Sequence, residues 1–136
     1  MVKNVELGKE LVVTEKNRIG ILADMAKKLA DGGINIEGVA GYALKDEAKI
    51  MLVAEDSLRA KEILAKGGYK SVKENEVVVV ELENKPGALK GITAKLASAK
   101  IDIRYIYGTT CPVGCPARLI LSTTDNEKTI VLLKAK

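Results

Sequence analysis

The sequence predicts an α+β fold made of two tandem units, each with the element order strand, helix, strand, strand, helix, strand. Three observations carry this prediction. Apolar residues recur with helical spacing in some segments and as short β-branched runs in others. A strand–helix corner that contains Asn, a basic residue, a spacer and Gly occurs twice, at Asn17–Gly20 and at Asn84–Gly87. Residues 17–36 also match residues 84–103 at eight of twenty positions, which indicates an internal repeat.

The first unit, residues 1–74, begins with a strand that is best defined at Leu11–Val13. After the first corner, apolar residues at helical spacing predict a helix with one buried face, formed by Leu22, Met25, Ala26 and Leu29. Gly32-Gly33 is a stop signal for that helix. The remaining elements follow in order: strands over 34–42 and 49–54, a helix capped by Asp56 or Ser57, and a short strand over 69–73.

The second unit, residues 75–136, repeats this order at an offset of 67 residues. Val77–Val80 is its first strand, and the second corner leads into its first helix. Two further strands are predicted near 101–104 and 119–121, and a last helix near 126–133. Almost nothing follows that helix, so this unit is predicted to lack its own last strand. The segment Val2–Leu7 is spare and is expected to fill the gap.

Each unit is a split βαβ arrangement, in which right-handed crossovers place both helices on one face of an antiparallel sheet. The predicted architecture is therefore two ferredoxin-like βαββαβ repeats in tandem. The first and third strands of such a unit are central, and the second and fourth are edges. The central runs Val77–Val80 and Ile50–Val53 are apolar at every position, so one alternate set is expected to face outward as an apolar patch. Soluble monomers usually avoid such patches, which predicts a homodimer.

Composition restricts the possible functions. The net charge of +4 comes from 22 basic and 18 acidic residues that are interspersed along the chain, so nucleic-acid binding is not expected. No apolar stretch reaches transmembrane length and no signal peptide is evident, which predicts a cytoplasmic protein with no membrane partner. The chain contains no histidine, which removes the commonest general base and the commonest transition-metal ligand. We therefore expect no catalytic residues, no metal and no cofactor.

The segment Glu83–Leu89, followed by Ile101-Asp102-Ile103, resembles the ACT-domain family of small regulatory modules that bind amino acids. The first half echoes it in Asn17–Leu22 and Ile34-Asn35-Ile36. The resemblance covers nearly the whole chain and is closest to small stand-alone proteins with two ACT units and no enzyme domain. It implies a non-catalytic amino-acid sensor. Such a sensor acts either through a partner, for example a metabolic enzyme, or through its own assembly.

In ACT domains the ligand is held at the interface of two units. The resemblance implies that the strand–helix loop of one unit supplies backbone amides, and that the second strand of its neighbour supplies a polar side chain. Carried over to this chain, the implied ligand-binding residues are Asn17, Arg18, Ile19, Gly20, Ile21, Leu22 and Asn35 in the first half, and Asn84, Lys85, Pro86, Gly87, Ala88, Leu89 and Asp102 in the second.

Other interpretations of these residues stay open. Asn17 and Asn84 can instead shape the loop as Asx turns, and Asn35 and Asp102 can be solvated edge-strand residues. A ligand-free interaction or regulatory subunit of a metabolic enzyme is the alternative function. An acylphosphatase-like hydrolase fits less well, because its phosphate loop needs an Arg and the second copy has Lys85 where the first has Arg18.

Cys111 and Cys115 lie in a hairpin rich in Pro and Gly. A single chain cannot complete a four-thiolate zinc site with two cysteines, although two chains together could. A redox pair is a second possibility. The simplest interpretation is a tight exposed turn that carries two thiols.

Overall fold

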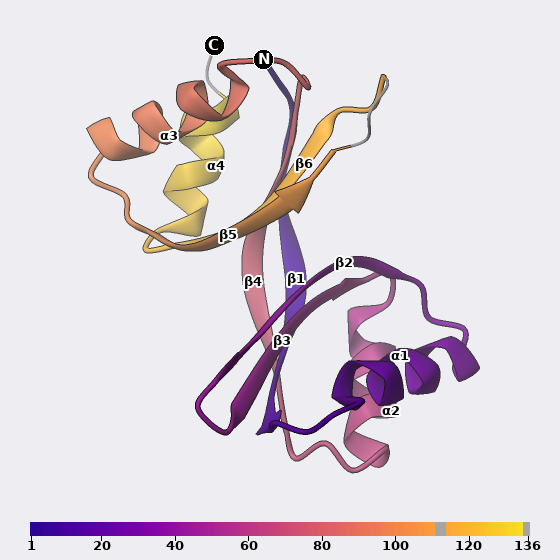
Figure 1. The fold of residues 1–136 in the computed structure, drawn as a ribbon. Helices are drawn as coiled ribbons and strands as arrows, with labels where there is room; N and C mark the ends of the chain where they lie inside the picture. The colour runs from indigo at the N-terminus through magenta and orange to yellow at the C-terminus, as the bar shows by residue number, and fades with distance from the viewer. Residues whose placement is uncertain (111–113, 135–136) are drawn as a thin grey trace. The chain divides into compact units, whose positions relative to one another are not determined.

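The structure is a computed structural model, and it describes residues 1–110 and 114–134. These residues form two compact units: the first unit comprises residues 9–75, and the second unit comprises residues 1–8 with residues 76–136. The elements in chain order are β1 Val2–Lys16, α1 Ile21–Asp31, β2 Ile36–Leu44, β3 Glu47–Ala54, α2 Ser57–Lys66, β4 Ser71–Leu82, α3 Ala88–Ser98, β5 Ile103–Thr109, β6 Ala117–Thr123 and α4 Asn126–Lys134 (Figure 1).

The first unit has the strand order β2-β3-β1-β4, with the first and third strands central as the sequence predicts. β1 pairs antiparallel with β3 from Leu11↔Leu52 to Lys16↔Glu47. Helices α1 and α2 lie next to each other in this unit (Figure 1). Their buried faces and the sheet share one aliphatic core, whose fully buried members are Leu11, Val13, Met25, Leu29, Leu52, Ala60 and Leu64. Asp56 caps α2 by accepting a hydrogen bond of 3.1 Å from the Arg59 amide.

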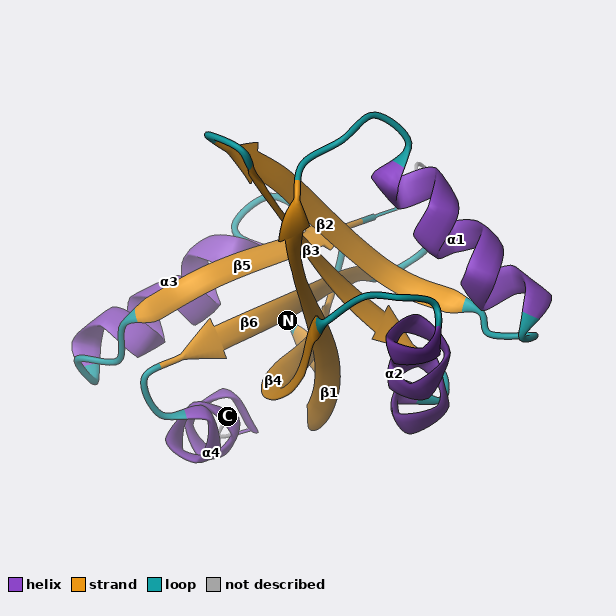
Figure 2. Ribbon diagram, turned by 90° about the horizontal axis from the view of Figure 1, so that it is seen from below, coloured by secondary structure: helices purple, strands orange, loops and turns teal. Residues whose placement is uncertain are grey.

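The second unit has the same order, β5-β6-β4-β1, with its own helices α3 and α4. β5 and β6 run antiparallel, as the arrows in Figure 2 show, and β6 pairs with β4 from Val78↔Leu121 to Leu82↔Ala117. The fourth strand position is filled by Val2–Gly8, the first half of β1. Val5 accordingly belongs to the core of this unit, together with Val78, Val80, Ile92, Leu96, Leu121 and Leu133.

The fold class predicted from the sequence is therefore confirmed, and the details differ in two ways. The sequence placed the unit boundary between residues 74 and 75, whereas in the structure residues 9–75 form one unit and residues 1–8 group with the residues from 76 onward. β4 is one strand of 12 residues, where the sequence indicated two separate runs. The reason is that Lys73–Glu76, which is exposed and polar, resembles a linker although its backbone continues the strand.

Two expectations about burial are wrong. Leu22 does not belong to the buried face of α1, because it is 45% exposed while the adjacent Ile21 is buried at 8%. The predicted outward-facing apolar patch is also not exposed: Val77 and Val79 are 0% and 5% exposed, and Met51 and Val53 are 8% and 6% exposed. Both alternate sets of the central strands are thus buried in the single chain. This patch therefore gives no support to the predicted homodimer.

Candidate ligand-binding corners

The first corner joins β1 to α1 through Asn17–Gly20. Gly20 takes a left-handed backbone conformation with φ of 87°, which residues other than glycine seldom adopt. The first intrahelical bond runs from the Asp24 amide to the Gly20 carbonyl at 2.9 Å, so the amides of Leu22 and Ala23 precede it. None of the described side chains caps this end of α1. The corner therefore presents N–H groups at the positive end of the helix dipole.

The second corner repeats this geometry at Asn84–Gly87. Gly87 also has a left-handed conformation, with φ of 90°. The Gly91 amide donates to the Gly87 carbonyl at 3.1 Å, and no described side chain caps the start of α3. The amides of Leu89 and Lys90 precede the first intrahelical bond, as Leu22 and Ala23 do in α1. The sequence thus predicted both corners correctly in position and backbone form.

The basic residue of each corner is held by a carboxylate of its own unit. Arg18 Nη2 donates to the Tyr69 hydroxyl at 3.3 Å and lies 3.7 Å from Asp24 Oδ2. Lys85 Nζ lies 2.8 Å from Glu83 Oε2. Hydrogen bonds from Lys28 and Tyr69 hold the pKa of Asp24 below its ordinary value, and the hydrogen bond from Lys85 does the same for the pKa of Glu83. These cations are therefore already paired, and the backbone amides remain the main anion donors.

Exposed apolar side chains surround the two glycines. Ile19 is 103% exposed and Leu22 45% exposed at the first corner, and Leu89 is 50% exposed at the second. Ile21 and Ala88, two of the predicted site residues, are instead buried in the cores of their units. Each corner thus combines unpaired N–H groups with an apolar surface within a few residues. That combination suits a small molecule with a carboxylate and an aliphatic group.

Asn35 and Asp102 do not lie at the corner of their own unit. Each follows the far end of the first helix of its unit, and a helix of 11 residues is about 16 Å long. Their backbones are used by the sheet: the Asn35 carbonyl accepts from the Glu55 amide at 3.4 Å, and the Asp102 carbonyl accepts from the Thr124 amide at 3.0 Å. Both residues are exposed. Neither residue therefore lies beside the corner of its own unit.

The structure adds neighbours that the sequence pattern did not indicate. The Asn17 amide donates to the Asp46 carbonyl at 2.7 Å, which fixes the first corner to the β2–β3 turn. At the second corner a cavity of about 360 Å³ is lined by Asn84, Glu83 and Lys3 on one side and by Gly114–Pro116 on the other. Lys3 and Asp46 belong to none of the sequence motifs and lie far from the corners in sequence. They lie beside the corners only because their strands pair in the sheet.

Cys115 is bonded in a disulfide, so the interpretation as two free thiols is wrong for this residue, and Cys111 lies outside the described residues.

Among the residues that the structure describes, no three Asp, Glu or Cys side chains are grouped to hold a metal ion. In the same part of the chain, no helix is both long enough and apolar enough to cross a membrane.

Two ferredoxin-like units in tandem, each with a glycine corner at the start of its first helix, define the fold of this chain. Solved structures share it. A protein from Bacteroides thetaiotaomicron has a TM-score of 0.87 and 23% identity, with 96% of this chain and 88% of that chain covered. The ligand-free regulatory subunit of aspartate kinase from Thermus thermophilus has a TM-score of 0.68 and 15% identity, with 97% and 95% covered. A structure of aspartokinase alpha and beta subunits has a TM-score of 0.67 and 15% identity, with 98% and 96% covered.

These similarities establish a common fold. No protein-family model matches this sequence, and no curated protein matches it.

Proposed function

We propose that this chain is a cytoplasmic, non-catalytic regulatory protein that binds an α-amino acid with an aliphatic side chain at one or both corners. One observation carries the proposal: unpaired helix amides and exposed apolar side chains occur together at Gly20 and again at Gly87. The ligand carboxylate accepts hydrogen bonds from the amides after the glycine, where the helix dipole favours negative charge. The ligand side chain lies against Ile19 and Leu22, or against Leu89.

The ligand also has an ammonium group, which needs an acceptor such as a carboxylate or an amide oxygen. Asn35 and Asp102 are suitable acceptors, and each lies a helix length away from its own corner. We therefore place the ligand at an interface between ACT units, with a second copy of the chain as the source of the acceptor. This arrangement makes the protein a homodimer in the bound state. The two corners are not equivalent, because Asp102 carries a charge and Asn35 does not.

A regulatory protein of this kind needs an output. Two of the structures that share the fold are described as a regulatory subunit and as subunits of aspartate kinase. By analogy, we propose that ligand binding here changes the affinity for a partner enzyme of metabolism. The analogy supports this role and does not identify the enzyme.

The test is calorimetry with the twenty amino acids, followed by substitution of the corner glycines. Gly87→Val and Gly20→Val place a β-branched residue at a left-handed φ, so each is expected to distort its corner and to abolish binding there. Gly87→Asn and Gly20→Asn are the matched controls, because Asn tolerates this conformation, and they should retain most of the affinity. Circular dichroism checks that the helices remain, and light scattering with and without ligand measures the dimer.

The outcomes separate the two candidate functions. Heat from at least one aliphatic amino acid, lost in the Val variants and kept in the Asn variants, supports the sensor. No heat from any of the twenty favours the ligand-free regulatory subunit. Binding that survives both Val substitutions places the ligand away from the corners and contradicts the proposed site.

A further inference from the structure

A second cavity lies in the second unit, between α3, α4 and the first residues of β1. Its volume is about 610 Å³, which is within the range of small-molecule pockets. Of the corner residues, only Ala88 lines it. Lys3 lines both this cavity and the smaller cavity at the second corner. The inference below concerns the space beside Gly91 and does not depend on the proposed function.

The corresponding place in the first unit is occupied by side chains. At the repeat offset of 67 residues, Asp24 and Lys28 of α1 correspond to Gly91 and Lys95 of α3. Lys28 Nζ donates to Asp24 Oδ1 at 2.6 Å, and the Tyr69 hydroxyl donates to the other carboxylate oxygen. Tyr69 is 4% exposed and comes from the segment that connects α2 to β4. An ion pair and an aromatic ring therefore fill this place.

In the second unit, Gly91 stands where the first unit has Asp24, and no aromatic residue is among the described residues that line the cavity. Among the described residues, a Cβ built on Gly91 would meet no atom within 4 Å outside the backbone of its own helix. Its fourth strand, Val2–Gly8, comes from before the first unit in the chain, whereas Gly67–Lys70 of the first unit lead directly from α2 into β4. The opening thus depends on this topology and on a glycine near the start of α3.

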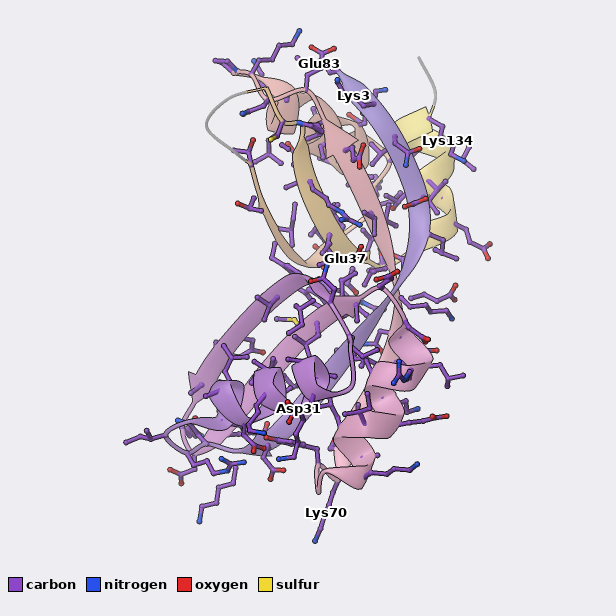
Figure 3. The ribbon with its side chains drawn as sticks, turned by 90° about the vertical axis from the view of Figure 1, so that its right-hand side faces the viewer. Lys3, Asp31, Glu37, Lys70, Glu83 and Lys134 are labelled. Atoms are coloured by element: carbon purple, nitrogen blue, oxygen red, sulfur yellow. The ribbon has the colours of Figure 1, made fainter. Side chains whose placement is uncertain are left out.

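The walls of the cavity have two kinds of surface. Its apolar part includes Val5, Ile92 and Leu133, which are 3%, 2% and 2% exposed. Its polar part includes three lysines, Lys3, Lys95 and Lys134, and no acidic residue occurs among the described residues that line it. Figure 3 shows Lys3 on β1 and Lys134 at the end of α4, at the same end of this unit. Neither lysine forms an ion pair with any residue that the structure describes.

We propose that this cavity binds a medium-chain aliphatic carboxylate. The hydrocarbon chain occupies the apolar part beside Gly91, and the carboxylate lies near Lys3 and Lys134. The positive charge of the lysines favours an anion, and the aliphatic walls favour a hydrocarbon chain over a strongly polar group. Each methylene transferred from water to the cavity should tighten binding about fourfold.

The experiment measures binding of hexanoate, octanoate and decanoate by calorimetry, below the concentrations at which these acids aggregate. Affinity should rise about fourfold per added methylene. Octanol and octylamine are the controls for charge. Octanol should bind more weakly than octanoate, and octylamine should show no binding, because its cation faces the lysines.

Gly91→Leu should fill the cavity and abolish octanoate binding, while the helix tolerates leucine well. Gly91→Ala is the matched control, since a single methyl group leaves most of the space. Lys134→Gln should weaken octanoate at least several-fold, and Lys70→Gln in the first unit should leave its affinity unchanged. The proposal is overturned if octanoate does not bind, if it binds Gly91→Leu as well as the unaltered protein, or if octylamine binds equally.

Discussion

Replacing Val5 with alanine tests whether Val2–Gly8 is an integral strand of the second unit. The Val5 side chain is 3% exposed and belongs to the core that contains Val78 and Leu133. The substitution removes two methyl groups, each with a transfer free energy of about 0.8 kcal/mol. The cavity that remains adds a further cost, so the free energy of unfolding should fall by about 2–3 kcal/mol. For a chain of this length, that loss lowers Tm by roughly 8–10 °C.

Urea unfolding followed by circular dichroism gives the free energy, and calorimetry gives the Tm. The matched control is Leu7→Ala on the same strand, because Leu7 is a larger side chain that is 44% exposed. Its substitution should change the free energy of unfolding by no more than about 0.5 kcal/mol. If Val5→Ala is as mild as Leu7→Ala, residues 2–8 are a loose tail and the assignment of the fourth strand is wrong.

Two further substitutions test the contrast between the units. Burial and the bond to Asp24 raise the pKa of Tyr69 to about 12, so the unfolded chain releases this proton at a lower pH, near 10, than the folded chain does. The contribution of the protonated Tyr69 to the free energy of unfolding should therefore be fully present below pH 10 and be lost between pH 10 and 12. Denaturation curves of Tyr69→Phe should lack that part of the decline. Gly91→Ala adds a methyl group into open space near the start of α3, so thermal unfolding should show a gain in the free energy of unfolding of about 0.4–1 kcal/mol. A loss of stability would mean that the space beside Gly91 is not open.

The repeat and its glycine corners could be predicted from the sequence because they depend on local chemistry. Gly20 and Gly87 each end a β-branched run and begin a helical pattern, and the structure gives both a left-handed φ. That Val2–Gly8 supplies the fourth strand of the second unit could be inferred only by counting elements, since the residues of this segment do not indicate which strand they pair with. The exposure of Leu22 was missed because helical spacing admits Ile21 or Leu22 as the first buried residue, and packing decides between them.

The cavity beside Gly91 could not be predicted either. Its opening depends on Gly91, which the sequence shows, and on the strand that lies beside α4, which only the tertiary structure shows. The pairing of Arg18 with Asp24 and Tyr69 is a similar case, because Tyr69 lies 51 residues from Arg18 in the chain. Sequence reasoning placed Arg18 in the site, and the structure shows that its own unit already holds its charge.

The assignment of Val2–Gly8 to the second unit imposes an order in time on folding. During synthesis, residues 9–75 carry all the elements of the first unit and can fold as they emerge, because domains fold as units from the N-terminal side. Residues 1–8 are made before the first unit, yet they have no partner in the sheet of the second unit until residues 76–82 of β4 have been made. A fragment that begins at residue 76 keeps both helices α3 and α4 but leaves β4 with an open edge, which invites pairing between molecules. The second unit thus includes a strand that is made before the first unit and that can pair only after β4 has been made.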